Sequence, residues 1–160
     1  MIRLVLAAAV AATLVLPAYA AEWTRYIDPR SGAGVDIPPG YGVNGPAGEG
    51  DGKIYRAADG RSAISVWGAP AGGEFSTAMA RRIGQDEAEG WGLTYRSVTP
   101  DWAAWSGTRA GHVFYAKTIL VCDGRQTANV RLQYPAADIP KFDVIAMRLG
   151  QSLAQDGGCF

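Results

Sequence analysis

The most regular alternation of hydrophobic and polar residues lies between Gly111 and Pro135, GHVFYAKTILVCDGRQTANVRLQYP. In its second half, apolar residues alternate with polar ones, and the apolar set is Ala128, Val130, Leu132 and Tyr134. This period of two is typical of an antiparallel strand with one buried face. The first half is apolar on both faces, which favours a strand in the interior of a sheet. Asp123-Gly124 between the halves indicates a hairpin turn.

The same Asp-Gly signature occurs twice more, at Asp51-Gly52-Lys53 and at Asp59-Gly60-Arg61. The second of these turns makes residues 53–68 a shorter predicted hairpin. The remaining predicted strands cover residues 23–29, 32–39, 93–99 and 102–111. The Gly/Pro-rich stretch from Ile37 to Gly52 predicts a long surface loop, because so many glycines and prolines disfavour a continuous helix or strand.

Two segments have helical spacing. In residues 74–91, Met79 and Ile83 share a face, Ser76 or Thr77 is the predicted N-cap, and Gly90 is the predicted end. In residues 137–155, Asp138 is the predicted cap and Pro140 lies in the first turn. The second helix has the clearer amphipathic stripe, formed by Phe142, Ile145, Ala146, Leu149 and Leu153.

The order of these elements predicts an α+β fold. Strands come in runs, one helix interrupts them and one follows them, which favours an antiparallel β-sheet of about six to eight strands with two main helices packed on it. No repeat or linker divides the chain. We therefore expect residues 21–160 to form a single α+β domain, since about 140 residues suit one hydrophobic core.

The first twenty residues, MIRLVLAAAVAATLVLPAYA, have the three parts of a secretory signal peptide. Arg3 supplies positive charge, an apolar run extends from Leu4 to Leu16, and Ala18-Tyr19-Ala20 is a cleavage site of small residues. The alternative is a membrane anchor, but the run has only about 13 residues where a spanning helix needs about 20. The sequence thus predicts a cleavable signal peptide at residues 1–20, no membrane insertion after cleavage, and a periplasmic or secreted protein.

Charge excludes one class of partner. The chain has 15 Lys and Arg against 15 Asp and Glu, and removal of Arg3 with the signal peptide leaves 14 against 15. A near-neutral chain without a run of basic residues gives no electrostatic basis for nucleic-acid binding. Phosphate-binding glycine patterns are also missing from the sequence, so we expect no nucleotide cofactor.

Cys122 and Cys159 are the two cysteines of the chain. In an oxidising compartment two cysteines usually pair, and a loop of this length contributes about 4 kcal/mol in loop-entropy treatments. A metal pair and a redox pair are the alternatives. The sequence has no C-x-x-C motif, and the single His112 leaves too few soft ligands for zinc. We therefore expect a structural disulfide that fixes the C-terminal tail to a strand end.

Laid out in this order, the chain resembles PsbP-like or Mog-like domains over nearly its whole length. The resemblance rests on the opening YIDPRSGAGVDIPPGY, the hairpin YRAADGRSAISVWG, strands ending at LQYP, and a last helix beginning DIPKFDVIAMRLGQSL. The chain is also similar to small exported Gram-negative proteins of unknown function. The resemblance implies a binding or assembly module serving a photosystem, Ran-GTPase or cell-envelope partner, with no shared catalytic residues.

Candidate catalytic and metal-binding groups are few. A triad would have to combine His112 with Ser106 and with Asp101 or Asp123, but the G-x-S-x-G elbow is missing from the sequence, and a structural histidine is the favoured interpretation. The acidic cluster formed by Asp86, Glu87 and Glu89 is predicted to be a solvated helix face paired with Arg81 or Arg82. The Asp-Gly turns have too few acidic ligands for a calcium loop, so no metal is expected.

Aromatic residues are the main candidates for a contact surface. Trp91, Trp102 and Trp105 lie within a short segment, and Tyr41 lies in the predicted glycine-rich loop. Trp102 and Trp105 should point to opposite faces of a strand, so one of them could be exposed. The alternative is that they are core residues. The sequence thus favours a non-catalytic binding or assembly module with a protein or cell-envelope partner; the alternatives are a small-ligand carrier with an aromatic-lined pocket and a secreted hydrolase using His112.

Overall fold

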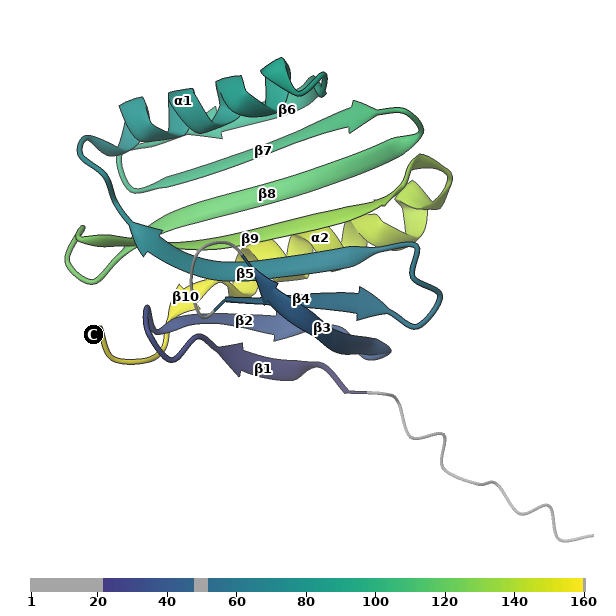
Figure 1. Ribbon diagram of the computed structural model, residues 1–160, viewed down its shortest axis with the longest axis horizontal. Helices are drawn as coiled ribbons and strands as arrows, with labels where there is room; N and C mark the ends of the chain where they lie inside the picture. Colours follow the sequence, from purple (N-terminus) through teal and green to yellow (C-terminus); the bar gives the residue numbers. More distant parts are fainter. Residues whose placement is uncertain (1–21, 48–51, 160) are drawn as a thin grey trace, which may run out of the picture.

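Seven strands pair into one antiparallel sheet in the order β3-β4-β5-β9-β8-β7-β6 (Figure 1). The computed structural model describes residues 22–47 and 52–159, so the predicted signal peptide at residues 1–20 and Asp51 of the first Asp-Gly turn lie outside the described residues. The strands are β3 (Tyr41–Ala47), β4 (Gly52–Ala57), β5 (Ala63–Pro70), β6 (Gly92–Val98), β7 (Trp102–Arg109), β8 (His112–Val121) and β9 (Gln126–Pro135).

The large sheet consists of two meanders. Strands β3 to β5 form the first and strands β6 to β9 form the second. They are joined by an antiparallel ladder in which Ala63–Pro70 of β5 pairs with residues 126–133 of β9, in reverse order. Helix α1 (Phe75–Ala88) leaves β5 at this junction and leads to β6 at the far edge of the sheet (Figure 1).

A second, smaller sheet holds the opening pair of strands. Its order is β1 (Thr24–Ile27), β2 (Ala33–Ile37) and β10 (Ala154–Gln155), all antiparallel. The predicted α+β class, the large antiparallel sheet and the two helices are confirmed. A short 3-10 turn (Ala136–Asp138) precedes the second helix, α2 (Ile139–Ser152). Strand β10 is too short to leave a periodic pattern, so the prediction of one sheet missed the second one.

The prediction of a continuous surface loop over residues 37–52 is wrong. Residues 41–47 form β3, which pairs with β4 along the outer edge of the large sheet. An edge strand needs a partner on one side only, so it tolerates residues that a central strand excludes. A β-bulge between Val43 and Gly45 absorbs the irregularity, and Gly45 has a positive φ of 149° there. Residues 48–51 lie outside the described residues.

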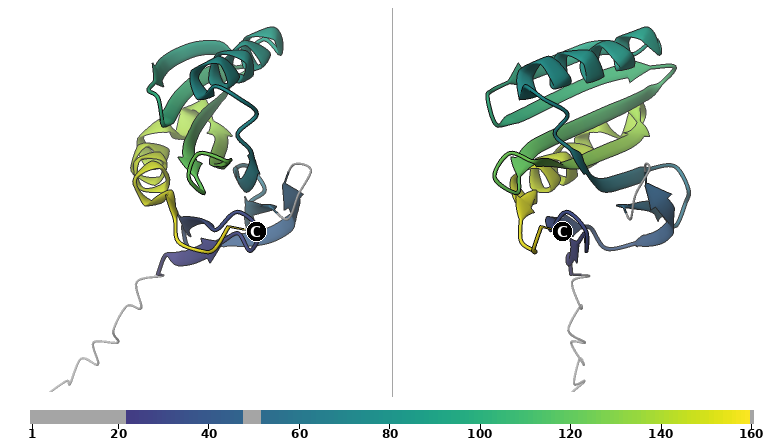
Figure 2. Two further views of the ribbon diagram at one scale, coloured as in Figure 1. Left: turned by 90° about the vertical axis from the view of Figure 1, so that its left-hand side faces the viewer. Right: turned by 60° about the vertical axis from the view of Figure 1, so that its left-hand side comes forward.

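Each face of the large sheet has its own core. In the left view of Figure 2, α2 lies on one side of the sheet and α1 on the other. The α2 side is apolar, and its fully buried side chains include Ile64, Val66, Leu132 and Leu149. The α1 side is built by Phe75, Met79, Ile83, Trp91, Ala103, Trp105, Phe114 and Ala116. Burying each large apolar side chain stabilises the fold by about 1.5–3 kcal/mol, so both cores contribute.

Helix α2 confirms the predicted amphipathic stripe. Phe142 and Leu149 are buried, and Pro140 lies in the first turn. Asp138 occupies the N-cap position as predicted, but its side chain makes no capping hydrogen bond and instead pairs with Arg61 at 3.2 Å. Helix and sheet meet closely at Gly150, since a Cβ there would collide with the Tyr115 hydroxyl of β8.

The N-cap of α1 is Glu74, so the prediction of Ser76 or Thr77 is wrong by two or three residues. The Glu74 carboxylate accepts the Ser76 hydroxyl (2.6 Å), the Ser76 amide (2.9 Å) and the Thr77 amide (2.7 Å). A carboxylate satisfies these free amides and also meets the positive end of the helix dipole. Gly90 follows the helix end with φ +87°, in agreement with the prediction.

Replacing Glu74 with alanine should lower the melting temperature at pH 7 and do so less at pH 2. The hydrogen bonds from Ser76 and Thr77 lower the pKa of Glu74 from 4.5 to about 2. Because the pKa is lower in the folded protein, the cap stabilises the fold above pH 4.5 and is lost as pH falls towards 2. Thermal unfolding at both pH values checks this, with Glu87→Ala as the exposed control. An equal melting-temperature loss at both pH values would contradict the charged cap.

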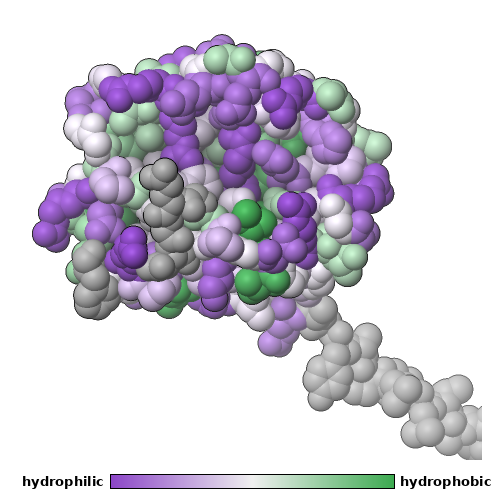
Figure 3. Space-filling view, in the orientation of Figure 1, coloured by the Kyte–Doolittle hydropathy of each residue, from purple (hydrophilic) through white to green (hydrophobic). Residues whose placement is uncertain are grey.

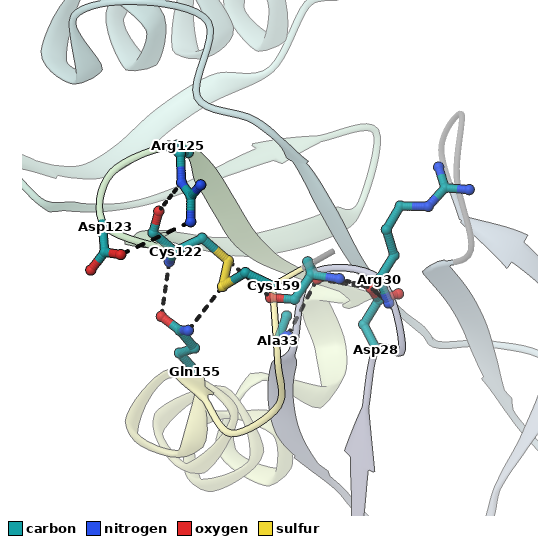
Figure 4. The surroundings of a disulfide bond; sticks show 9 residues. Asp28, Arg30, Ala33, Cys122, Asp123, Arg125, Gln155 and Cys159 are labelled. Atoms are coloured by element: carbon teal, nitrogen blue, oxygen red, sulfur yellow. Dashed lines mark hydrogen bonds and ion pairs between the residues drawn. A yellow bond between two sulfur atoms is a disulfide. The ribbon is translucent and has the colours of Figure 1, made fainter.

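The C-terminal tail is fastened to the sheet by the predicted disulfide. Cys122, just after β8, is bonded to Cys159, with the two Cα atoms 5.7 Å apart (Figure 4). Gln155 bridges the same pair, because its Oε1 accepts the Cys122 amide at 2.8 Å and its Nε2 lies 3.0 Å from the Cys159 sulfur. The amides of Asp156 and Gly157 also donate to the carbonyl of residue 32. The tail is therefore fixed to both sheets.

Candidate functional site

The polar face of β9 is covered, although its alternating pattern predicts one buried face only. Thr127, Asn129 and Arg131 lie on the side of the sheet that α1 occupies, and Asn129 is fully buried. Burying polar groups is unfavourable unless they are hydrogen-bonded, so a buried polar cluster requires partners. Helix α1 supplies them through two residues of its inner face, Arg82 and Asp86.

Asp86 is the acidic centre of this cluster. Its carboxylate pairs with the Arg131 guanidinium at 2.9 Å and accepts the Trp105 indole N–H at 2.6 Å. The predicted solvated position paired with Arg81 or Arg82 is therefore wrong, since Asp86 is only 7% exposed. The signal was present in the sequence: Met79, Ile83 and Asp86 are spaced i, i+4 and i+7, which places all three on the apolar face.

Arg82 has no acidic partner among the described residues. One guanidinium nitrogen donates to the Asn129 side-chain oxygen at 2.9 Å, and no carboxylate of the described chain lies within ion-pair distance. The guanidinium instead stacks over the Trp67 ring, 4.7 Å from its centroid, and lies 5.8 Å from that of Trp105. Burial, together with the like charge of Arg131, lowers the pKa of Arg82 to about 10, and the attraction of the Asp86 carboxylate opposes this shift. It remains a cation at neutral pH.

Asn129 holds that guanidinium in place. Its side-chain oxygen accepts from Arg82 and also from the Thr118 hydroxyl at 2.8 Å. Its side-chain nitrogen donates to the Trp67 carbonyl at 3.1 Å and to the Thr127 hydroxyl at 3.1 Å. These bonds on both ends fix the orientation of the amide, so its oxygen points at Arg82. The β5–β9 ladder thus positions an arginine that belongs to α1.

A pocket of about 350 Å³ opens beside Arg82, between α1 and the strands β5 and β9. We call it the α1 pocket, and its lining residues are Trp67, Ala69, Pro70, Ala71, Ala78, Met79, Arg81, Arg82, Gln85 and Thr127. Its walls combine an indole and small apolar side chains with long polar side chains from α1. Figure 3 shows this face of the molecule, with hydrophilic side chains crowded over its upper part, where α1 lies.

The four aromatic residues predicted to form a contact surface do not lie together. Trp91 and Trp105 are buried in the core beneath α1, 5% and 1% exposed. Trp102 is half-buried on the opposite face, as the strand spacing predicts, with the Lys117 ammonium 5.8 Å from its ring. Tyr41 lies on edge strand β3, where its hydroxyl is 2.6 Å from that of Ser62. A partner could touch Trp91 or Trp105 only after α1 moves away, and the binding role of all four stays a prediction.

The prediction of the contact surface did not include Trp67 and Arg82, which line the α1 pocket, or Asn129, which holds Arg82. Their positions follow from the β5–β9 pairing, in which Trp67 is directly opposite Asn129. Sequence spacing does not give the register of strands so far apart in the chain. The one local signal is Arg82 itself, which directly precedes Ile83 and so flanks the apolar face of the helix.

The triad alternative does not form. His112 is exposed at the start of β8, and among residues 22–47 and 52–159 no hydrogen bond joins it to Ser106, Asp101 or Asp123. The Ser106 hydroxyl pairs instead with that of Thr94 at 2.9 Å. Within the same described ranges, no three histidine, cysteine or acidic side chains cluster closely enough to hold a metal ion. Neither α1 nor α2, the α-helices of these described ranges, is long and apolar enough to cross a membrane.

Comparisons with known proteins found similarity in structure. No protein-family model matches the sequence, and no curated protein does. The solution structure of the cyanobacterial PsbP, CyanoP, from Synechocystis sp. PCC 6803 is similar, with a TM-score of 0.59 at 11% identity, over 86% of this chain and 95% of that one. The Saccharomyces cerevisiae Ran-binding protein Mog1p has a TM-score of 0.60 at 8% identity, over 84% and 96%.

A point mutant of Mog1 gives a TM-score of 0.61 at 8% identity, again over 84% of this chain and 96% of that one. The similarity spans nearly the whole of each neighbour, so it concerns the complete arrangement of sheet and helices. At such low identity it establishes the fold alone. The resemblance noted in the sequence is therefore confirmed at that level: this chain has the PsbP/Mog-like α+β fold.

Proposed function

We propose that this protein is an exported, non-catalytic binding or assembly module and that the α1 pocket is its recognition site. One observation carries the proposal: Arg82 is a cation held beside an open pocket by Trp67 and Asn129, without an acidic partner in the described chain. Buried charges are usually paired. An arginine that is held in place but left unpaired is therefore suited to pair with a group from outside.

The PsbP/Mog-like fold supports a binding role. One of its similar structures is named a Ran-binding protein, so the fold is used for binding another protein. The partner proposed for the present chain is a protein or a cell-envelope component, with an acidic group presented to Arg82. A nucleic-acid partner is not proposed, because acidic and basic residues balance over the whole chain.

Export is proposed from two independent features. Residues 1–20 have the composition of a signal peptide, and Cys122 and Cys159 form a disulfide that an oxidising compartment would preserve. The proposed location is the periplasm or the extracellular space.

Native mass spectrometry of protein expressed with its own signal tests the proposal. In the exported fraction we expect a mature chain beginning at Ala21, two hydrogens lighter because of the disulfide, with additional mass that denaturation removes. We expect Arg82→Gln to lower the occupancy of that additional species at least about tenfold, since it removes a charge-assisted contact. Arg96→Gln is the control with the same charge change, because Arg96 is exposed on β6. Equal occupancy in both variants would refute the α1 pocket as the recognition site.

A second function, transport of a small ligand, is favoured by the size of the α1 pocket. About 350 Å³ lies within the range of small-molecule sites, and Trp67 supplies an aromatic wall. The mass of the additional species separates the two functions, because a protein partner adds kilodaltons and a small ligand adds hundreds of daltons.

A further inference from the structure

We propose that the α1 pocket binds a carboxylate attached to an apolar or aromatic group. This inference rests on the proposed function and names the chemistry that the pocket selects. Its basis is the combination of one fixed guanidinium with a wall that has both apolar and polar parts, the apolar part next to Trp67.

The charge balance of the cluster favours a monoanion. Asp86 is paired with Arg131, so that pair is neutral as a unit. Arg82 adds a second positive charge beside the one carboxylate, so the three groups together carry one net positive charge, although Asp86 also attracts Arg82. A carboxylate would neutralise it, whereas a phosphate dianion would leave an excess negative charge close to Asp86. Arg81 also lines the pocket, but it is exposed and screened by solvent.

The geometry also favours a planar acceptor. A guanidinium presents parallel N–H donors in a fixed plane, which matches the two oxygens of a carboxylate. One Arg82 nitrogen is held by Asn129, and the Trp67 ring stacks against the guanidinium. These two contacts fix the plane of the group before any ligand arrives, so little side-chain entropy is lost on binding. Gln85 and Thr127 line the same pocket, and the Thr127 hydroxyl is already engaged by Asn129 and by the Ala69 carbonyl.

The rest of the wall selects what the carboxylate is attached to. Ala69, Pro70 and Ala78 present apolar surface in the same pocket as Trp67, and a purely polar acid would leave that surface uncovered. An aromatic or branched aliphatic group would cover it and pack against the indole. Two sources have this chemistry: a free small acid, or a peptide chain that ends in an apolar residue with its terminal carboxylate.

The test uses isothermal titration of the mature protein with 3-phenylpropionate and with its uncharged amide. We expect the acid to bind at least about tenfold more tightly than the amide, since only the acid forms the charge-assisted pair. Phenyl phosphate at pH 8 should bind more weakly than the acid. These comparisons use the unaltered protein, so they do not depend on whether a variant folds. Equal affinity for acid and amide, or tighter binding of the phosphate, would overturn the proposal.

Variants then locate the site. Arg82→Gln should abolish the difference between acid and amide, Arg82→Lys should restore only part of it because an ammonium lacks the planar fork, and Arg96→Gln should leave it unchanged. An acid preference that survives in Arg82→Gln would refute the assignment to this pocket.

Titration with the peptide Ac-Ala-Ala-Phe, which has a free carboxyl end, distinguishes between the two sources of the carboxylate. Tighter binding of this peptide than of 3-phenylpropionate indicates a chain end, and weaker binding indicates a free acid; both support the carboxylate class. Failure of this inference can be distinguished from failure of the proposed function. If no acid binds while the species seen by native mass spectrometry still depends on Arg82, the binding module stands and only the carboxylate class is refuted.

Discussion

Replacing Asp86 with alanine should lower the free energy of unfolding by about 3–5 kcal/mol, the typical cost of removing one partner from a buried ion pair. The Asp86 and Arg131 side chains are only 10% and 17% exposed, so solvent screens the pair weakly. The substitution leaves the Arg131 cation without its carboxylate and removes the acceptor of the Trp105 indole N–H. It also leaves Arg82 and Arg131 as two neighbouring cations with no anion between them.

Urea unfolding measures the effect through the midpoint and slope of the transition. Glu87→Ala is the matched control, because Glu87 is the next residue of the same helix and is exposed. The double variant Asp86→Ala/Arg131→Met should lose less stability than Asp86→Ala alone, since it removes the unpaired charge as well. If Asp86→Ala behaved like Glu87→Ala, the carboxylate would not be the centre of the cluster.

Replacing both cysteines with alanine should lower the free energy of unfolding by about 4 kcal/mol, because the 37-residue separation of Cys122 and Cys159 closes a long loop in the unfolded chain. Alanine is preferred to serine because Cys122 is almost fully buried, and a buried hydroxyl would need a partner. The loss should also loosen the tail around Gln155, which bonds to both cysteines. Chemical unfolding of both proteins measures the difference.

Reductant provides the control. Dithiothreitol should lower the stability of the wild-type protein towards that of the double variant and should leave the double variant unchanged. A wild-type protein that keeps its full stability after complete reduction, verified by thiol titration, would contradict the stabilising role of the bond.

Elements whose pattern is local could be predicted from the sequence. The alternation from Ala128 to Tyr134 gave the apolar face of β9, and the stripe from Phe142 to Leu153 gave α2. In both, periodicity marks the face that packs in the apolar core, although the polar face of β9 is covered by α1 as well. The disulfide was also predictable, since two cysteines leave one intramolecular pairing.

Features that depend on distant contacts could not be predicted. Strand β3 exists because β4 offers it a partner, and its own glycines disfavour a strand. Asp86 is buried because β9 brings Arg131 opposite it, a juxtaposition that neither segment encodes alone. The α1 pocket likewise requires Trp67 and Asn129 to be neighbours across a ladder.

That ladder also bears on the order in which the molecule folds. The two meanders can each form through short loops, but pairing β5 with β9 joins segments that lie far apart in the chain, and the loop-closure entropy must be overcome before the contacts form. Because Trp67 faces Asn129 within this ladder, the site cannot exist in a partly folded chain that contains only the separate meanders. Ligand binding to this site would therefore report that the long-range pairing of β5 with β9 is complete.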